Sequence, residues 1–66
     1  MLELRLLDPD GYTVPGTVHT NVPATDEAKI RDRLLNEVAP QDAAQWTAWG
    51  FKCDARDYRV SPDPAT

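Results

Sequence analysis

The sequence predicts a small α+β domain in which one helix packs on one face of an antiparallel sheet. Three observations support this class: an alternating apolar segment at the start of the chain, a helical stripe of apolar residues in the middle, and a second alternating segment further on. The predicted order is strand, strand, helix, strand, strand, which makes a two-layer ββαββ domain. We expect a single domain over residues 1–60. A flexible C-terminal tail should cover residues 61–66, which hold two prolines and no large apolar side chain.

The first two predicted strands form a hairpin. Residues 1–7 alternate leucine with charged side chains, which is typical of a strand with one buried face. The sequence DPDG at residues 8–11 favours a reversal, because proline fixes φ and glycine accepts positive φ. Residues 12–22 are rich in Thr and Val and predict the second strand. Pro15 removes one backbone donor, so we expect a bulge or kink there and an edge position for this strand.

The middle of the chain predicts one amphipathic helix. Thr25 is a suitable N-cap, and Pro40 should end the helix because an interior proline lacks an N–H group. The sequence QDAAQ at residues 41–45 could add one further helical turn after it. One face is apolar with a period of four, and it consists of Ile30, Leu34 and Val38, with Leu35 beside them. Such a stripe is wide enough to cover one face of a sheet.

Four of the five aromatic residues lie close together near the C-terminus. Trp49, Phe51 and Cys53 alternate with small or polar residues, so we expect a strand that turns these three side chains into the core. Trp46 precedes that strand, and two interpretations of it remain open. It packs under the C-terminal end of the helix, or it is exposed and marks a surface that binds a partner.

The last elements are short. Residues 54–57 read DARD and predict a polar turn. A final strand should follow, with Tyr58 and Val60 on its apolar side.

Composition and charge exclude several classes of function. The 66 residues carry a net charge of −4, which disfavours the binding of a nucleic-acid backbone. One cysteine and one histidine are too few for a structural zinc site, and we expect no metal and no cofactor. His19 and Cys53 occur in no motif of a nucleophile and its base, so we expect no catalytic residues and no enzyme.

The sequence also bears on location. It contains no run of apolar residues long enough for a membrane span and no secretory signal pattern, so we expect a cytoplasmic protein without membrane contact. The bias toward Ala, Asp, Thr, Arg and Pro is typical of GC-rich genomes, such as those of actinobacteria and their phages.

These observations favour a small acidic protein-interaction module, an adaptor or inhibitor that docks on a larger protein. Self-association through an edge strand or the uncovered sheet face is a further expectation, and it is compatible with the first. The expected partner-binding residues are Trp46, Tyr12 and Leu7. The alternative is a single-stranded nucleic-acid binder that stacks bases on aromatic residues of the sheet.

Overall fold

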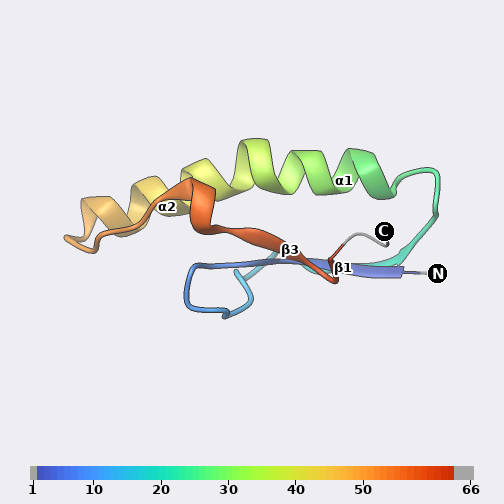
Figure 1. Ribbon diagram of the computed structural model, residues 1–66, viewed down its shortest axis with the longest axis horizontal. Coiled ribbons are helices and arrows are strands. Elements are labelled where there is room, and N and C mark those ends of the chain that lie inside the picture. Colours follow the sequence, from blue (N-terminus) through green and yellow to red (C-terminus); the bar gives the residue numbers. More distant parts are fainter. Residues whose placement is uncertain (1, 64–66) are drawn as a thin grey trace.

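A computed structural model describes residues 2–63 and shows two layers, a long helical layer over a three-stranded antiparallel sheet (Figure 1). The sheet has the spatial order β2-β1-β3 and consists of β1 (Leu2–Leu7), β2 (His19–Val22) and β3 (Arg59–Ser61). The helical layer consists of α1 (Glu27–Arg33), the π-helical turn η1 (Leu34–Val38) and α2 (Ala39–Ala48). A short 3-10 helix, η2 (Ala55–Asp57), precedes β3. The α+β class is confirmed, but the described residues form three strands, so the order ββαββ is not observed.

The predicted turn between the first two strands is present. The Gly11 N–H donates to the Asp8 carbonyl at 2.9 Å, which closes the four-residue DPDG turn. The second strand is shorter than predicted, because residues 15–18 leave the sheet after an isolated bridge between Leu7 and Thr13. The interruption falls at Pro15, as its missing donor suggests, and β2 lies at an edge of the sheet as predicted.

The helix runs past Pro40, so the prediction that this proline ends it is wrong. A proline ring inside an α-helix clashes with the carbonyl four residues earlier, which here is that of Asn36. The π-turn just before Pro40 relieves this conflict, since its wider winding pairs the Ala39 N–H with the Leu34 carbonyl five residues back. The N-cap is Asp26 rather than Thr25. At about 1.5 Å per residue the whole helical layer spans about 33 Å, close to the 38 Å long axis of the molecule.

The core lies between the two layers and is mainly aliphatic. Its largest fully buried side chains are Leu4, Leu6 and Leu34. The other buried apolar residues are Val14, Val22, Ala39, Ala43, Tyr58 and Val60. The helical stripe faces this core as predicted, with Ile30 and Val38 partly buried against it, whereas Leu35 is exposed. Tyr58 is the aromatic residue of the core, and neither tryptophan belongs to it.

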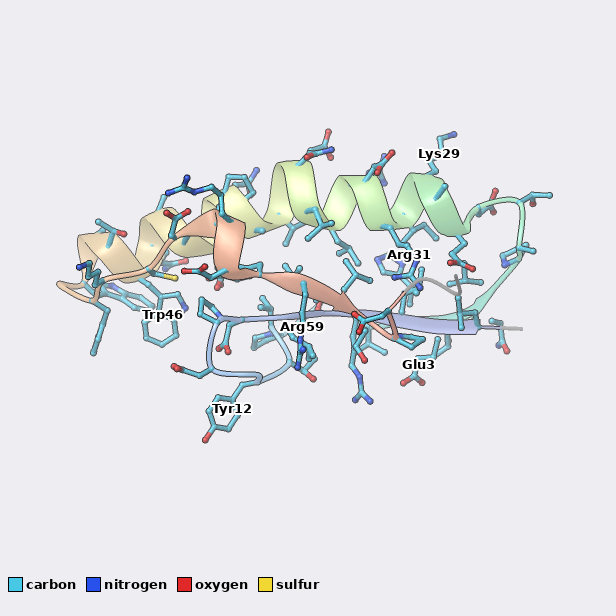
Figure 2. All side chains as sticks on the ribbon, in the orientation of Figure 1. Glu3, Tyr12, Lys29, Arg31, Trp46 and Arg59 are labelled. Carbon is cyan, nitrogen blue, oxygen red and sulfur yellow. The ribbon has the colours of Figure 1, made fainter. Side chains whose placement is uncertain are left out.

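The face of the sheet that the helix leaves uncovered is charged. Glu3 and Arg59 point away from the helical layer (Figure 2), and Arg5 is exposed on the same side by the alternation of β1. On the helix, Arg31 points toward the sheet and pairs with Glu27 at 2.9 Å, while Lys29 points away. The uncovered face therefore presents charged side chains at these three positions.

Residue 61, the first residue of the predicted tail, lies in a strand. Ser61 belongs to β3, where it pairs with Arg5 of the central strand. Residues 64–66 of that tail lie outside the described residues.

Candidate functional site

The C-terminal end of α2 has the geometry of a Schellman cap, in which a left-handed glycine ends the helix. Gly50 has φ +92°, a value that glycine adopts without strain. Its N–H donates to the Thr47 carbonyl at 3.0 Å, and the Phe51 N–H donates to the Trp46 carbonyl at 3.0 Å. In such a cap the residues at the positions of Trp46 and Phe51 usually make an apolar side-chain contact. Here the Trp46 and Phe51 rings lie 5.3 Å apart, edge to face.

Three aromatic side chains gather at this cap, and we call Trp46, Trp49 and Phe51 the aromatic cluster. The Trp46 ring contacts Trp49 as well, at 5.4 Å and perpendicular to it. Trp49 is 61 % exposed and Phe51 57 %, whereas Trp46 is half-buried between them. The prediction that Trp49 and Phe51 lie on a strand and form the core is therefore wrong. Residues 49–53 form no strand, and the cluster packs on itself at the surface.

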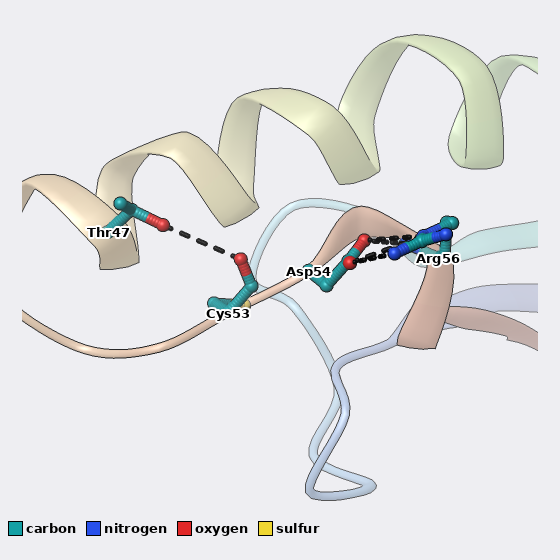
Figure 3. A network of polar contacts seen from close by, with 4 residues as sticks. All are labelled: Thr47, Cys53, Asp54 and Arg56. Atoms are coloured by element: carbon teal, nitrogen blue, oxygen red, sulfur yellow. Dashed lines mark hydrogen bonds and ion pairs between the residues drawn. The ribbon is translucent and has the colours of Figure 1, made fainter.

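The chain returns from the cap along α2 and is held there by polar contacts (Figure 3). The Thr47 hydroxyl donates to the Ala43 carbonyl at 3.0 Å and to the Cys53 carbonyl at 3.5 Å. Asp54 caps η2 by accepting from the Arg56 N–H at 2.9 Å, and it also accepts from the Arg56 guanidinium at 2.8 Å. The side-chain bond from Arg56, followed by the backbone bond, lowers the pKa of Asp54 to about 2.

A second polar group fixes Trp46 from the side of the core. The Asp42 carboxylate accepts from the Trp46 indole N–H at 3.1 Å and from the Tyr58 hydroxyl. Cys53 Sγ lies 3.3 Å from the same hydroxyl. Burial, and then the bonds to Asp42 and Cys53, raise the pKa of Tyr58 above its ordinary value. Tyr58 thus stays a neutral donor that joins the core to the base of the aromatic cluster.

The loop between β1 and β2 faces the aromatic cluster and is itself well ordered. One oxygen of Asp8, Oδ1, accepts from the backbone N–H groups of Asp10 at 2.9 Å and Tyr12 at 3.0 Å. The Asp8 N–H in turn donates to the Tyr12 carbonyl at 2.9 Å. These bonds hold Tyr12 at the tip of the loop, where its ring is 73 % exposed and points away from the body of the molecule (Figure 2).

A pocket of about 530 Å³ opens between this loop and the end of α2, and we call it the aromatic groove. Its first wall is the loop, with Asp8, Pro9, Asp10, Tyr12, Thr13 and Pro15. Its second wall is the helix end and the returning chain, with Trp46, Phe51, Lys52 and Cys53. The groove exists because α2 extends past the end of the sheet (Figure 1), so the underside of the helix end is covered by loops instead of strands.

The structure brings two of the three predicted partner-binding residues together. Tyr12 and Trp46 line opposite walls of the groove, and Trp46 is half-buried, which lies between the packed and the exposed positions that the sequence left open. Leu7 is half-buried at the end of β1, where it pairs with Arg59, and it does not line the groove. Sequence reasoning missed Trp49 and Phe51 as surface residues. Gly50 is the residue that could have indicated this, because a glycine after a helix predicts a Schellman cap. Trp46 and Phe51 then occupy the two apolar positions of that cap.

The same placement bears on the nucleic-acid alternative, in which bases stack on aromatic residues of the sheet. Base stacking on a sheet needs aromatic residues on exposed strand positions. Trp46 lies on α2, while Trp49, Phe51 and Tyr12 lie in loops. That the protein does not bind nucleic acid at physiological salt remains a prediction.

Residues 2–63 contain no group of three or more His, Cys, Asp or Glu side chains that could hold a metal ion. None of the helices in the described part of the chain is long and apolar enough to cross a membrane. A scan of protein-family models, a search of curated proteins and a search of solved structures each found no match to this chain.

Proposed function

We propose that the protein is a small interaction module that docks on a larger protein through its aromatic end. The observation that supports this proposal is the exposure of Trp49 and Phe51 beside a core that uses neither. Burial of a large apolar side chain contributes about 1.5–3 kcal/mol, so a chain of 66 residues forgoes much stability by leaving both at the surface.

The aromatic cluster also has the properties of a binding hot spot. Tryptophan and tyrosine are enriched among the residues that contribute most to interfaces. Here the rings are held in place before any partner binds, because Trp46 is bonded to Asp42 and packs edge to face on both neighbours. A preorganised surface loses less conformational entropy on association, so more of the contact energy is available for binding.

The charge of the molecule bears on the kind of partner. With eleven acidic and seven basic residues the surface is acidic, which favours a partner whose docking site is basic. The charged outer face of the sheet makes the aromatic end a better candidate than that face for any self-association. A second copy of the chain is therefore the competing partner.

The test is affinity capture with variant baits. The parent chain, the double variant Trp49→Ala/Phe51→Ala and the control Leu35→Ala are immobilised and exposed to lysate of the source cells, and bound proteins are quantified by mass spectrometry. Leu35 is a suitable control because it is an exposed apolar residue that does not line the groove. Circular dichroism establishes first that all three chains are folded.

We expect one protein to be retained by the parent and by Leu35→Ala and lost from the double variant. Truncation of two hot-spot aromatics costs at least about 2 kcal/mol, or about a thirtyfold loss in affinity. Equal retention by all three baits would show that the aromatic cluster is not the docking surface. Retention of the chain itself, with a doubled molar mass in solution, would identify a second copy as the partner.

A further inference from the structure

We infer that the aromatic groove receives an arginine side chain presented by the partner. This inference rests on the proposed docking function and specifies the chemistry of the contact. It follows from three features of the groove: free carboxylate oxygens on one wall, aromatic rings on the other wall, and a local charge that is negative.

The loop wall of the groove carries carboxylate oxygens that accept no hydrogen bond from residues 2–63. Oδ1 of Asp8 accepts two backbone hydrogen bonds, and among residues 2–63 no donor forms a hydrogen bond with its Oδ2. The Asp10 carboxylate is exposed, and it accepts no hydrogen bond and forms no ion pair within the same residues. A guanidinium presents several N–H donors in a fixed fork, which matches one or two carboxylates.

The rings supply a surface that suits the same group. Trp46 and Phe51 line one wall of the groove. Tyr12 belongs to the opposite wall, but its ring points away from the body of the molecule. A cation within about 6 Å of an aromatic face is attracted by the ring quadrupole, and arginine is found there more often than lysine. A guanidinium is planar and weakly hydrated, so it can stack on a ring and still bond a carboxylate.

The charge balance agrees with a cationic guest. The groove contains two carboxylates and one ammonium group, that of Lys52, so its formal charge is negative, like that of the whole chain. Lys52 forms no ion pair with either aspartate in the described structure, and the carboxylates therefore remain available. An apolar guest would fill the same space but would offer no donor to Asp8 Oδ2 or to the Asp10 carboxylate.

The probe is a pair of peptides that differ in one charge. Acetyl-Gly-Ser-Arg-Ser-Gly-amide is compared with the same peptide carrying citrulline, which is the uncharged isostere of arginine. Each is titrated into the ¹⁵N-labelled full chain, and shifts are followed at the Trp46 indole N–H and at the amides of Tyr12 and Phe51. Asp10→Asn tests the carboxylate, and Asp32→Asn on α1 is the matched control, because it removes an exposed charge that does not line the groove.

We expect weak, local binding of the arginine peptide at millimolar concentration, with the citrulline peptide at least about fivefold weaker. Asp10→Asn should weaken the arginine peptide by about threefold or more, added salt should also weaken it, and Asp32→Asn should have no such effect. The inference is overturned if both peptides bind equally, if the shifts lie elsewhere, or if none occur up to about 10 mM. Shifts that depend on protein concentration without peptide would also overturn it, because they identify a second copy as the occupant.

The two proposals fail in different ways. If capture of a partner depends on Trp49 and Phe51 but the arginine peptide does not bind, docking stands and the arginine assignment is wrong. If capture does not depend on them, the docking proposal fails whatever the peptide does.

Discussion

Tyr58 joins the core to α2 through its hydroxyl, which donates to Asp42. A hydrogen bond to a charged group contributes about 1.5–3 kcal/mol, so Tyr58→Phe should lower the free energy of unfolding by about that amount. Tyr12→Phe is the matched control and should change it by less than about 0.5 kcal/mol, because that ring is exposed. Urea unfolding followed by circular dichroism measures both. Equal effects of the two variants would show that the bond to Asp42 contributes nothing.

The raised pKa of Tyr58 predicts how stability depends on alkaline pH. The folded-state pKa lies above the ordinary value of 10.0, so the contribution of this residue is complete below that pH. Above it the unfolded chain releases the phenolic proton before the folded chain does, and stability falls. Tyr58→Phe removes this titration, so its stability should fall less steeply above pH 10 than that of the parent.

Asp54 titrates in the opposite range. Its pKa of about 2 is lower than the ordinary 3.8, so its contribution to stability is present above about pH 4 and is lost as the pH falls toward 2. An NMR titration of the Asp54 carboxyl carbon should give a midpoint near 2 in the parent and a higher midpoint in Arg56→Ala. An unchanged midpoint in the variant would mean that Arg56 is not the cause.

At the scale of elements, the π-turn is explained by Pro40, and a deletion tests this. Deletion of Asn36 removes the extra residue of the π-turn, so that the segments before and after it can form one regular α-helix. Pro40 then lies in the interior of that α-helix, which costs about 3 kcal/mol. The deletion alone should therefore be strongly destabilising, and Pro40→Ala in the same chain should recover much of the loss. If the second change brings no recovery, the turn has another cause.

Gly50 controls the end of the helix and, through it, the aromatic cluster. A residue with a Cβ at φ +92° is strained, so Gly50→Ala should cost about 1–2 kcal/mol. Gly50→Asn should cost less, because asparagine tolerates positive φ better. The Trp46 indole signal should broaden or shift in the alanine variant as the cap loosens. An alanine variant with parental stability and an unmoved indole would contradict the cap.

Local signals explain which elements could be predicted. The DPDG turn and the helical stripe depend on neighbouring residues alone, and both are present. The prediction from Pro40 was wrong because a π-turn can accommodate a proline within a helix. No residue type in this segment predicts a π-turn. The alternation of Trp49, Phe51 and Cys53 fits a strand and a capped helix end equally well over so few residues. Gly50 is the residue that distinguishes the two, since its place after a helix predicts a cap.

At the scale of the whole molecule, the aromatic cluster lies outside the core. The core closes with leucine, valine and alanine under a helix that extends beyond the sheet, and this extension is what exposes the cluster. Tyr58 and Val60, which the sequence predicts on one apolar side of the last strand, are both buried in the core. The assignment of Trp49 and Phe51 is reversed. Trp46, whose indole is bonded to Asp42, should now matter more for stability than Trp49.

The measurement that tests this account most directly is the free energy of unfolding of Trp49→Ala beside Leu34→Ala. Trp49 is mostly exposed and contacts Trp46 edge to face, so its truncation should cost no more than about 0.5–1.5 kcal/mol. Leu34 is fully buried, and its truncation should cost about 2–5 kcal/mol, enough to unfold most of so small a domain. Urea unfolding by circular dichroism separates the two. A folded, nearly parental Trp49→Ala is the predicted result, and a loss as large as that of Leu34→Ala would return the aromatic cluster to the core and contradict the account.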